Sequence, residues 1–232
     1  MVGQLAALRR FPVASLGGES PNEVRLADGG MIGERAFRIM DAETARPMDP
    51  ALLEEGLQFQ ARFLDASVVG DLDSWARVRS PDGTESPLRD EAWQAELSRR
   101  VGRRVRVAPA DTTTQARELH LLSRPTLGFL ERAYGRALES ARIRANFVVD
   151  LHGGKVFGED AWLGKHIRVG DGLFEVVGPS RGCLLTEAGP PAAGDLGMIG
   201  GLLHVRAGEL GVRLRAVSGL RVRVGDPVAL VG

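Results

Sequence analysis

The sequence has very little cysteine: Cys183 is the only one among 232 residues. A single thiol cannot form a disulfide within the chain, so a disulfide-stabilised scaffold is excluded and a reducing compartment is compatible.

Long apolar runs are missing as well. The N-terminal MVGQLAALRRFPVAS has too short an apolar run for a signal peptide, and no stretch reaches the ~18 apolar residues of a membrane span. We therefore expect a cytoplasmic protein without a membrane partner.

An excess of charge of either sign is also missing, because 30 basic residues balance 30 acidic ones. This balance does not favour nucleic acid or an anionic membrane as a partner. Lysine is scarce: Lys155 and Lys165 are the only two. The four histidines have no paired metal spacing, which argues against a zinc site. The chain also has neither a Walker loop nor a dinucleotide-binding fingerprint.

Short segments of alternating apolar and polar residues dominate what is present. Residues 57–63 alternate as a half-buried strand does, and Pro81-Asp82-Gly83 separates two such segments as the turn of a hairpin. One helix is expected from Asp90 to Gly102, because apolar residues recur at every fourth position: Trp93, Leu97 and Val101. The pattern predicts a mainly β (α+β) fold with a few short helices.

The segment around the thiol alternates from Leu173 to Val177, which predicts a strand that ends at Gly178-Pro179. Residues 180–183 would then lie where the chain leaves a sheet, a common place for ligand contacts. A thiolate is a soft ligand for heavier transition metals, and the cation of Arg181 favours the thiolate. Alternatively, Cys183 is a small buried hydrophobe, since free cysteine is among the most buried residue types.

Two further places have the features of anion sites. Gly17 and Gly18 follow a short strand, and glycines in such a bend can present bare N–H groups, although many bends are simply turns. Ser123 to Thr126 connect a strand to a helix start, where free N–H groups attract phosphate or a carboxylate. Alternatively, Ser123 or Thr126 is an ordinary N-cap of this helix, and the junction binds no ligand.

Several motifs follow one another along nearly the whole chain. Residues 144–150 are RANFVVD, residues 157–164 are FGEDAWLG, and residues 224–228 are VGDPV, with the Cys183 strand between the last two. In this order they resemble the MOSC domain, named from the C-terminal part of molybdenum cofactor sulfurase. Residues 11–20, FPVASLGGES, and 31–44, MIGERAFRIMDAET, resemble the β-barrel domain that precedes MOSC in the mitochondrial amidoxime-reducing component and its bacterial relatives. Residues 65–114 match least well.

The resemblance implies two packed β-rich domains, an N-terminal β-barrel-like domain at residues 1–110 and a MOSC β-barrel at residues 111–232, with a cleft between them for a molybdenum–pterin cofactor (molybdopterin). Cys183 would ligate the molybdenum and be the catalytic residue. Arginine suits the grip on a phosphate because its planar guanidinium donates two hydrogen bonds at once. The pterin and its phosphate would be held by Ser15, Arg35, Thr126, Arg144, Asn146, Ser180 and Arg181. Pyridoxal phosphate is not expected.

Two positions depart from the family pattern. The family carries a Lys-Ser pair near the phosphate end of the pterin, and here Ser15 is kept but Ala14 replaces the lysine. The relatives usually carry Asp-Pro after the cysteine, and here residues 186–190 are TEAGP. Both departures concern how the cofactor would be held.

The resemblance implies an oxidoreductase that reduces a small N-hydroxylated substrate. Electrons would come from a separate donor protein, such as a ferredoxin, a cytochrome or a flavin reductase. Two alternatives stay open: a non-catalytic module that carries the cofactor, or a persulfide on Cys183, and a barrel that has lost its metal and keeps the cysteine in its core.

Overall fold

The computed structural model describes residues 1–27, 29–48, 55–65, 70–110, 118–134, 143–181, 206 and 208–231. The chain divides into two compact units. The barrel unit consists of Met1–Arg9, Asn22–Met31 and Glu118–Gly232, and the sheet unit of Arg10–Pro21 and Ile32–Arg117. Thus, two N-terminal segments that were expected in the first domain belong to the same unit as the C-terminal half. The expected mainly β architecture is confirmed.

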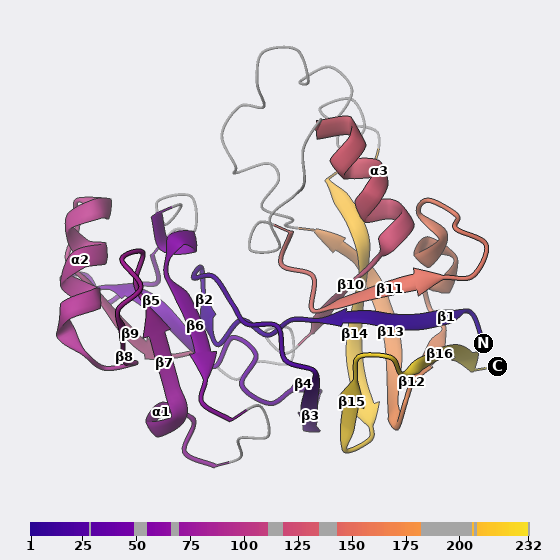
Figure 1. Ribbon diagram of the computed structural model, residues 1–232, viewed down its shortest axis with the longest axis horizontal. Helices are drawn as coiled ribbons and strands as arrows, with labels where there is room; N and C mark the ends of the chain where they lie inside the picture. Colours follow the sequence, from indigo (N-terminus) through magenta and orange to yellow (C-terminus); the bar gives the residue numbers. More distant parts are fainter. Residues whose placement is uncertain are drawn as a thin grey trace. The chain divides into compact units, whose positions relative to one another are not determined.

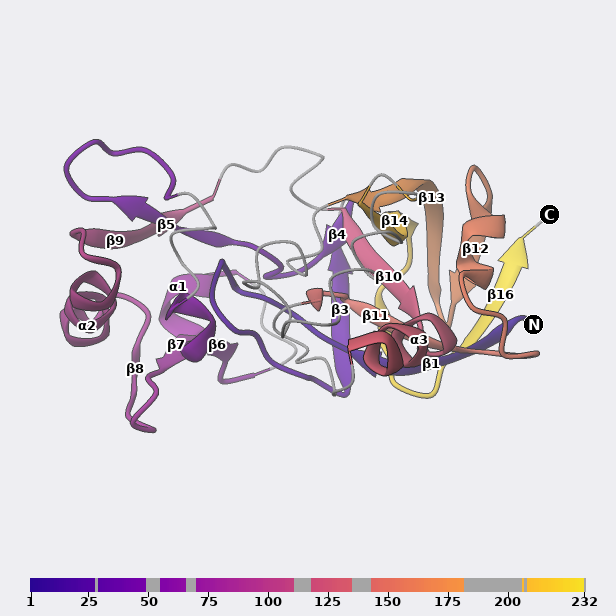
Figure 2. The same cartoon turned by 90° about the horizontal axis from the view of Figure 1, so that it is seen from above.

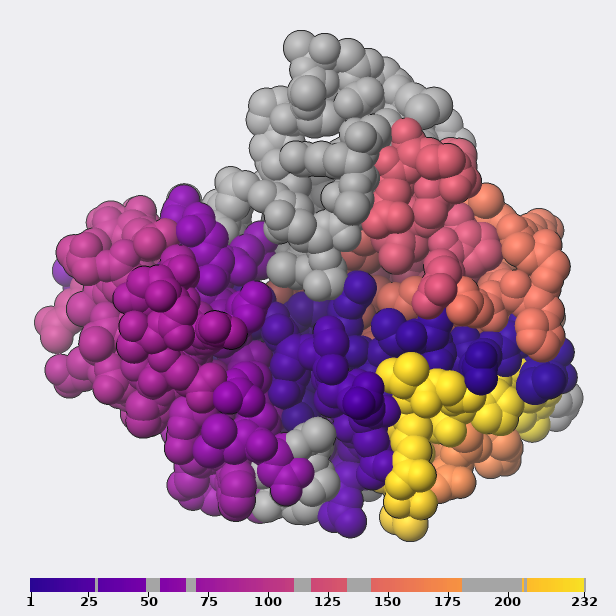
Figure 3. Space-filling view, viewed as in Figure 1, coloured from indigo at the N-terminus to yellow at the C-terminus, as the bar shows by residue number. Residues whose placement is uncertain are grey.

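Seven strands of the barrel unit form a closed barrel (Figure 1). In spatial order they are β1 (Gly3–Leu8), β11 (Phe147–Leu151), β10 (Leu119–Ser123), β14 (Glu209–Ser218), β13 (Gly172–Arg181), β12 (His166–Val169) and β16 (Pro227–Val231). All neighbouring pairs are antiparallel except β10 and β11, which are parallel. The barrel closes where Gly3 pairs with Val228, and Figure 3 shows the C-terminal residues in yellow against the indigo N-terminal strand.

The barrel interior is filled by alternate side chains of these strands, as the period of two requires. Phe147 and Phe174 meet edge to face at its centre, with ring centroids 5.4 Å apart. Leu5 and Leu8 both point into this core because a β-bulge between Leu5 and Ala7 shifts the register of β1. The bulge turns Ala7 to the outer side instead.

Among the described residues, a small sheet and two helical segments accompany the barrel. The sheet has the order β15 (Arg221–Arg223), β3 (Glu23–Ala27) and β4 (Gly30–Met31), and it adds Val24, Met31 and Val222 to the core. Outside the barrel, α3 (Arg124–Tyr134) lies along β10 and β11, as Figure 2 also shows. The short 3-10 helix η3 (Gly158–Trp162) contacts β10 and β14. A second apolar cluster lies on this outer side and contains Leu122, Leu130, Ile143, Ala145, Val148 and Leu210.

In the described part of the sheet unit, two three-stranded sheets and two α-helices surround an apolar core. One sheet has the order β2 (Val13–Ala14), β5 (Phe37–Asp41) and β9 (Val105–Pro109). The other has the order β6 (Gln60–Phe63), β7 (Ala76–Arg79) and β8 (Glu85–Pro87), and its predicted hairpin is confirmed. The helices are α1 (Leu72–Trp75) and α2 (Glu91–Val101).

Helix α2 is confirmed at both ends for the expected reasons. The side chain of Asp90 accepts a hydrogen bond from the N–H of Ala92, and Gly102 takes the left-handed conformation that ends the helix. Trp93 and Leu97, spaced four apart, are buried in the core of the sheet unit. Trp93 also donates from its indole N–H to the carbonyl of Leu88 at 3.1 Å, so it serves packing.

The prediction that β13 ends at Gly178-Pro179 is wrong, because the strand continues to Arg181. Register shifts between Val176 and Gly178 and between Pro179 and Arg181 let the strand keep pairing with β14. Proline lacks an N–H and is tolerated in a sheet at such irregularities. The carbonyl of Pro179 accepts a hydrogen bond from Nε of Arg213 at 3.0 Å. Consequently, Ser180 lies within the barrel wall.

Among the described residues, no helix is long and apolar enough to cross a membrane.

Candidate functional site

The turn that leads into β11 contains two of the predicted site residues. Arg144 has a φ of 51°, in the left-handed region, and only 8% of it is exposed. Asn146 is fully buried, and its side chain joins two neighbouring strands: Oδ1 accepts from the N–H of His120 at 2.9 Å, and Nδ2 donates to the carbonyl of Arg9 at 3.2 Å. The structure thus brings Arg144 and Asn146 into one turn that is fixed to both β1 and β10.

The strand-to-helix junction at the start of α3 already contains an anion from the chain itself. Glu159 is fully buried in η3, and its carboxylate accepts from the N–H of Ser123 and from the hydroxyl of Thr126, each at 3.1 Å. The Thr126 hydroxyl is also 2.8 Å from Ser123 Oγ and accepts from the N–H of Phe157 at 2.8 Å.

A hydroxyl has one proton to donate and two lone pairs, so these three bonds use the whole capacity of Thr126. Thr126 could contact a cofactor only if this network opened. Sequence reasoning missed Glu159, although the FGEDAWLG motif that supplied part of the resemblance contains it.

Two predicted site residues, Ser180 and Arg181, end β13. Ser180 is 6% exposed, and Arg181 pairs in register with Glu209 of β14. Cys183 lies outside the described residues, two positions after Arg181. Within the described part of the chain, no three His, Asp or Glu side chains form a group that could hold a metal.

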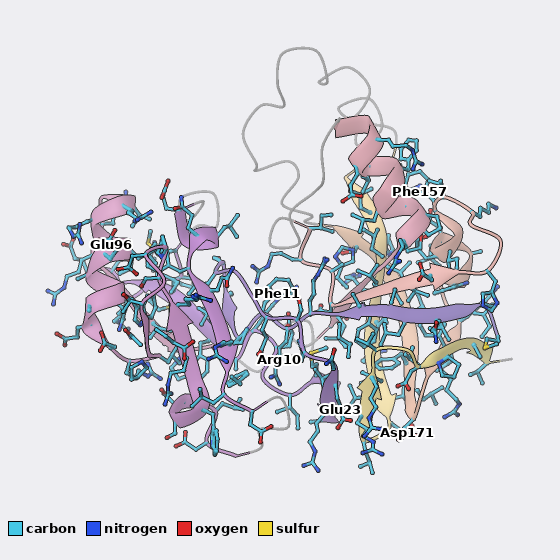
Figure 4. All side chains as sticks on the ribbon, viewed as in Figure 1. Arg10, Phe11, Glu23, Glu96, Phe157 and Asp171 are labelled. Atoms are coloured by element: carbon cyan, nitrogen blue, oxygen red, sulfur yellow. The ribbon has the colours of Figure 1, made fainter. Side chains whose placement is uncertain are left out.

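Arg206, three positions before β14, contacts residues of η3 and β14. Its Nη2 lies 2.7 Å from the carboxylate of Asp160, and its Nε donates to the carbonyl of Glu209 at 3.0 Å. The guanidinium also stacks on the ring of Phe157, at 4.1 Å from the centroid. Phe157, labelled in Figure 4 beside α3, packs edge to face on Phe129 of that helix. Thus, Arg206 is tied to η3, to the start of β14 and to the layer that α3 covers.

The remaining predicted residues, Ser15 and Arg35, belong to the sheet unit. Both have left-handed φ angles, 74° for Ser15 and 47° for Arg35. Because β2 and β5 pair in parallel, with Val13 opposite Phe37, Ser15 follows one end of the pairing and Arg35 precedes the other. They therefore lie at opposite ends of this short ladder. The Arg35 side chain forms an ion pair with Glu34, at 3.3 Å.

Beside Arg35, the sheet unit has a buried ion pair that sequence reasoning also missed. Nε of Arg10 lies 2.7 Å from the carboxylate of Glu19, and the guanidinium stacks on Phe63 at 4.6 Å from the ring centroid. Arg10 is fully buried, and Figure 4 labels it next to Phe11. This pair holds the bend of residues 17–19 in place, so the bend has a structural role.

Two hollows of about 310 and 410 Å³ lie on the sheet unit. The first is lined by residues of the β7–β8 hairpin and of α2, and the second by α2 and the start of β9. None of the predicted site residues lines either hollow.

A family model described as the MOSC domain matches residues 91–229. Among solved structures, the chain is similar to the YUAD protein from Bacillus subtilis, with 12% identity, a TM-score of 0.50, and coverage of 98% of this chain and 94% of that one. It is also similar to YiiM from Geobacillus stearothermophilus, with 19% identity, a TM-score of 0.37, and coverage of 49% of this chain. The match spans 54% of the YiiM chain. No curated protein matches the sequence.

Proposed function

Because the chain belongs to the MOSC domain family, whose domains bind the molybdenum cofactor, we propose that it is a molybdenum-cofactor-binding oxidoreductase. Its substrate would be a small N-hydroxylated compound, and its electrons would come from a separate donor protein. The observation that carries the proposal is the Arg144 turn, which holds a buried arginine in a left-handed conformation two residues before a fully buried asparagine.

The residues of this turn fit a phosphate-bearing group. A left-handed conformation costs a residue with a side chain on the order of 1 kcal/mol, and such strain is concentrated at ligand clamps and active sites. The planar fork of a guanidinium suits phosphate, to whose oxygens it can donate two hydrogen bonds at once. Arg144 would therefore grip the phosphate of the cofactor. Asn146 would position Arg144 by fixing the turn to β1 and β10.

Cys183 would supply the thiolate ligand of the metal, because it is the only thiol in the chain and comes two positions after Arg181, the last residue of β13. When bound, the molybdenum centre would supply the two-electron chemistry of N–O reduction, and the protein would supply binding and orientation. Ser180 and Arg181, which precede the thiol at the end of β13, would set the direction in which Cys183 enters the site.

A second candidate function is a cofactor or sulfur carrier without reductase activity. Ala14 favours it, since this position lacks the cation that the family resemblance places near the phosphate end of the pterin. A carrier needs only moderate and reversible retention, which fewer cationic contacts would give.

Two measurements on the purified full chain separate these functions. Elemental analysis for molybdenum, with fluorescence of the oxidised pterin, tests cofactor binding. Turnover of an amidoxime with reduced viologen as the electron source then tests the reductase. We expect about one molybdenum per chain, conversion to the amidine with viologen, and none with NADH alone. A metal-loaded protein that leaves several N-hydroxylated substrates unchanged would be a carrier, and a chain without molybdenum or pterin would contradict both functions.

A further inference from the structure

Arg9 occupies the position opposite Asn146, where β1 meets the Arg144 turn. Its backbone N–H donates to the carbonyl of Asn146 at 2.8 Å, and its carbonyl accepts from Nδ2 of the same residue. Ala7 packs in the outer cluster and Leu8 in the barrel core. Alternation along β1 then directs the Arg9 side chain to the outer side, the side that α3 covers.

The guanidinium of Arg9 is not fully satisfied. Its Nη1 is buried and has no hydrogen-bond partner among the described residues. Burial lowers the pKa of Arg9, and the carboxylate of Glu131 on α3, which raises that pKa, offsets only part of the effect. A buried donor without a partner costs about 1–3 kcal/mol, and more if it is charged. The buried Nη1 of Arg9 therefore lowers the stability of the folded state, and a bound anion that accepts its hydrogen bond would restore that stability.

We propose that Arg9 is a second anion-holding arginine at the Arg144 turn, and that its ligand is a phosphate group. Arg9 follows β1 and is hydrogen-bonded through its backbone to Asn146, and Arg144 precedes Asn146 by two residues, so the two arginines come from different segments of the chain. Two arginines with forked donors match the several oxygens of one phosphate better than one arginine does. The inference rests on the proposed function, in which this phosphate belongs to the cofactor, but phosphate binding itself requires neither metal nor turnover.

The experiment uses the full chain, produced in a host that makes no pterin cofactor. Its melting temperature is followed while inorganic phosphate is titrated at constant ionic strength, with acetate as the reference anion. The variants are Arg9→Met, Arg144→Met and the double variant. Methionine keeps much of the aliphatic stem of arginine and removes the charge. Arg124→Met is the matched control, because Arg124 lies in the same unit and forms an exposed ion pair with Asp150.

We expect phosphate to raise the melting temperature of the wild type and of Arg124→Met in the same way. Arg9→Met and Arg144→Met should each weaken phosphate binding by about tenfold or more. The fold loss of phosphate affinity in the double variant should be smaller than the product of the two single losses, since both arginines would hold one anion. Without phosphate, Arg9→Met should be as stable as the wild type or more stable, a result that a purely structural Arg9 would not give.

Wild-type phosphate affinity in Arg9→Met would overturn the inference, and so would a loss of stability in that variant without phosphate together with unchanged affinity. The proposed function fails separately. A chain that binds phosphate through Arg9 but never acquires molybdenum keeps the inference and loses the function. If the wild type is a molybdenum-loaded reductase and its Arg9→Met variant binds phosphate normally, the proposed function stands and the inference about Arg9 fails.

Discussion

The carboxylate of Glu159 lies at the start of α3, where its Oε2 accepts a hydrogen bond of 3.1 Å from the hydroxyl of Thr126. Its Oε1 accepts from the N–H of Ser123. Helix N-termini attract anions because their first N–H groups are unpaired and the helix dipole is positive there. In this chain, the anion at that end is a side chain of η3, which locks η3 to α3 and occupies the Ser123 N–H and the Thr126 hydroxyl.

Glu159→Ala should therefore destabilise the barrel unit strongly. The substitution leaves the Ser123 N–H and one hydroxyl proton of the Ser123–Thr126 pair buried without an acceptor, at about 1–3 kcal/mol each. Urea unfolding followed by circular dichroism measures the loss. The control is Glu175→Gln, which removes the half-exposed ion pair with Arg215 and should cost about 1 kcal/mol or less. Equal losses in the two variants would contradict the role of Glu159.

Local signals predicted much of the fold. Helix α2 could be predicted to the residue because its cap, its apolar spacing and its terminal glycine all lie within 13 residues, from Asp90 to Gly102. The hairpin at Gly83 could be predicted in the same way, because its turn needs a residue with a φ of 89° and glycine adopts such an angle without steric cost. The end of β13 could not be predicted in this way. Pro179 breaks a strand locally, and only the long-range pairing with β14 shows that the strand continues.

The site could be predicted only in part for the same reason. The Arg144 and Asn146 motif is a local pattern, and the structure does place both residues in one turn. The partners that decide what each side chain can do are distant in sequence. Glu159 is 33 residues from Thr126, and Arg9 is 137 residues from Asn146. Nothing in the local sequence marks either contact. Cys183 lies outside the described residues.

Asp41 should make the stability of the sheet unit depend on pH. The N–H groups of Thr44 and Glu43 donate to its Oδ1 at 2.8 and 2.9 Å. The bond from Thr44 is the main reason that the pKa of Asp41 is lowered. A carboxyl with a lowered pKa contributes stability above its unfolded pKa, and this contribution is lost as the pH falls through its folded pKa. The loss should therefore occur below about pH 4.

Urea unfolding of the wild type and of Asp41→Asn across this range measures the effect. The difference in free energy of unfolding should shrink as the pH falls, because asparagine has no charge to lose. Arg103→Gln removes only the 3.6 Å ion pair with Asp41, the smallest cause of the shift, and should keep most of the pH dependence. A constant difference between wild type and Asp41→Asn would refute the prediction.

Two substitutions at Arg144 separate its side chain from its backbone. Arg144→Ala and Arg144→Gly both remove the guanidinium, so both should weaken cofactor retention, by on the order of 2 kcal/mol for a charge-assisted contact. Glycine relieves the left-handed strain that alanine keeps. Arg144→Gly should therefore be the more stable of the two, by about 1 kcal/mol. Pterin fluorescence after dilution and dialysis measures retention, and thermal unfolding of the metal-free chains measures stability. Full retention in both variants would make Arg144 a structural residue.

Cys183→Ala tests the metal ligand directly. A thiolate ligand cannot be replaced by a methyl group, so the variant should lose its molybdenum, or bind it with an altered absorption spectrum, and should have no reductase activity. Cys183→Ser is the matched control, because it keeps the size of the side chain and offers a harder oxygen donor. It should bind the metal differently from the wild type and still fail to turn over.

If Cys183 were instead a buried core residue, the result would be reversed: the serine variant would lose stability because of its buried hydroxyl, while metal content and turnover would stay at the wild-type level in both variants. Thermal unfolding, elemental analysis and viologen-driven turnover on the same three proteins therefore decide between the two roles.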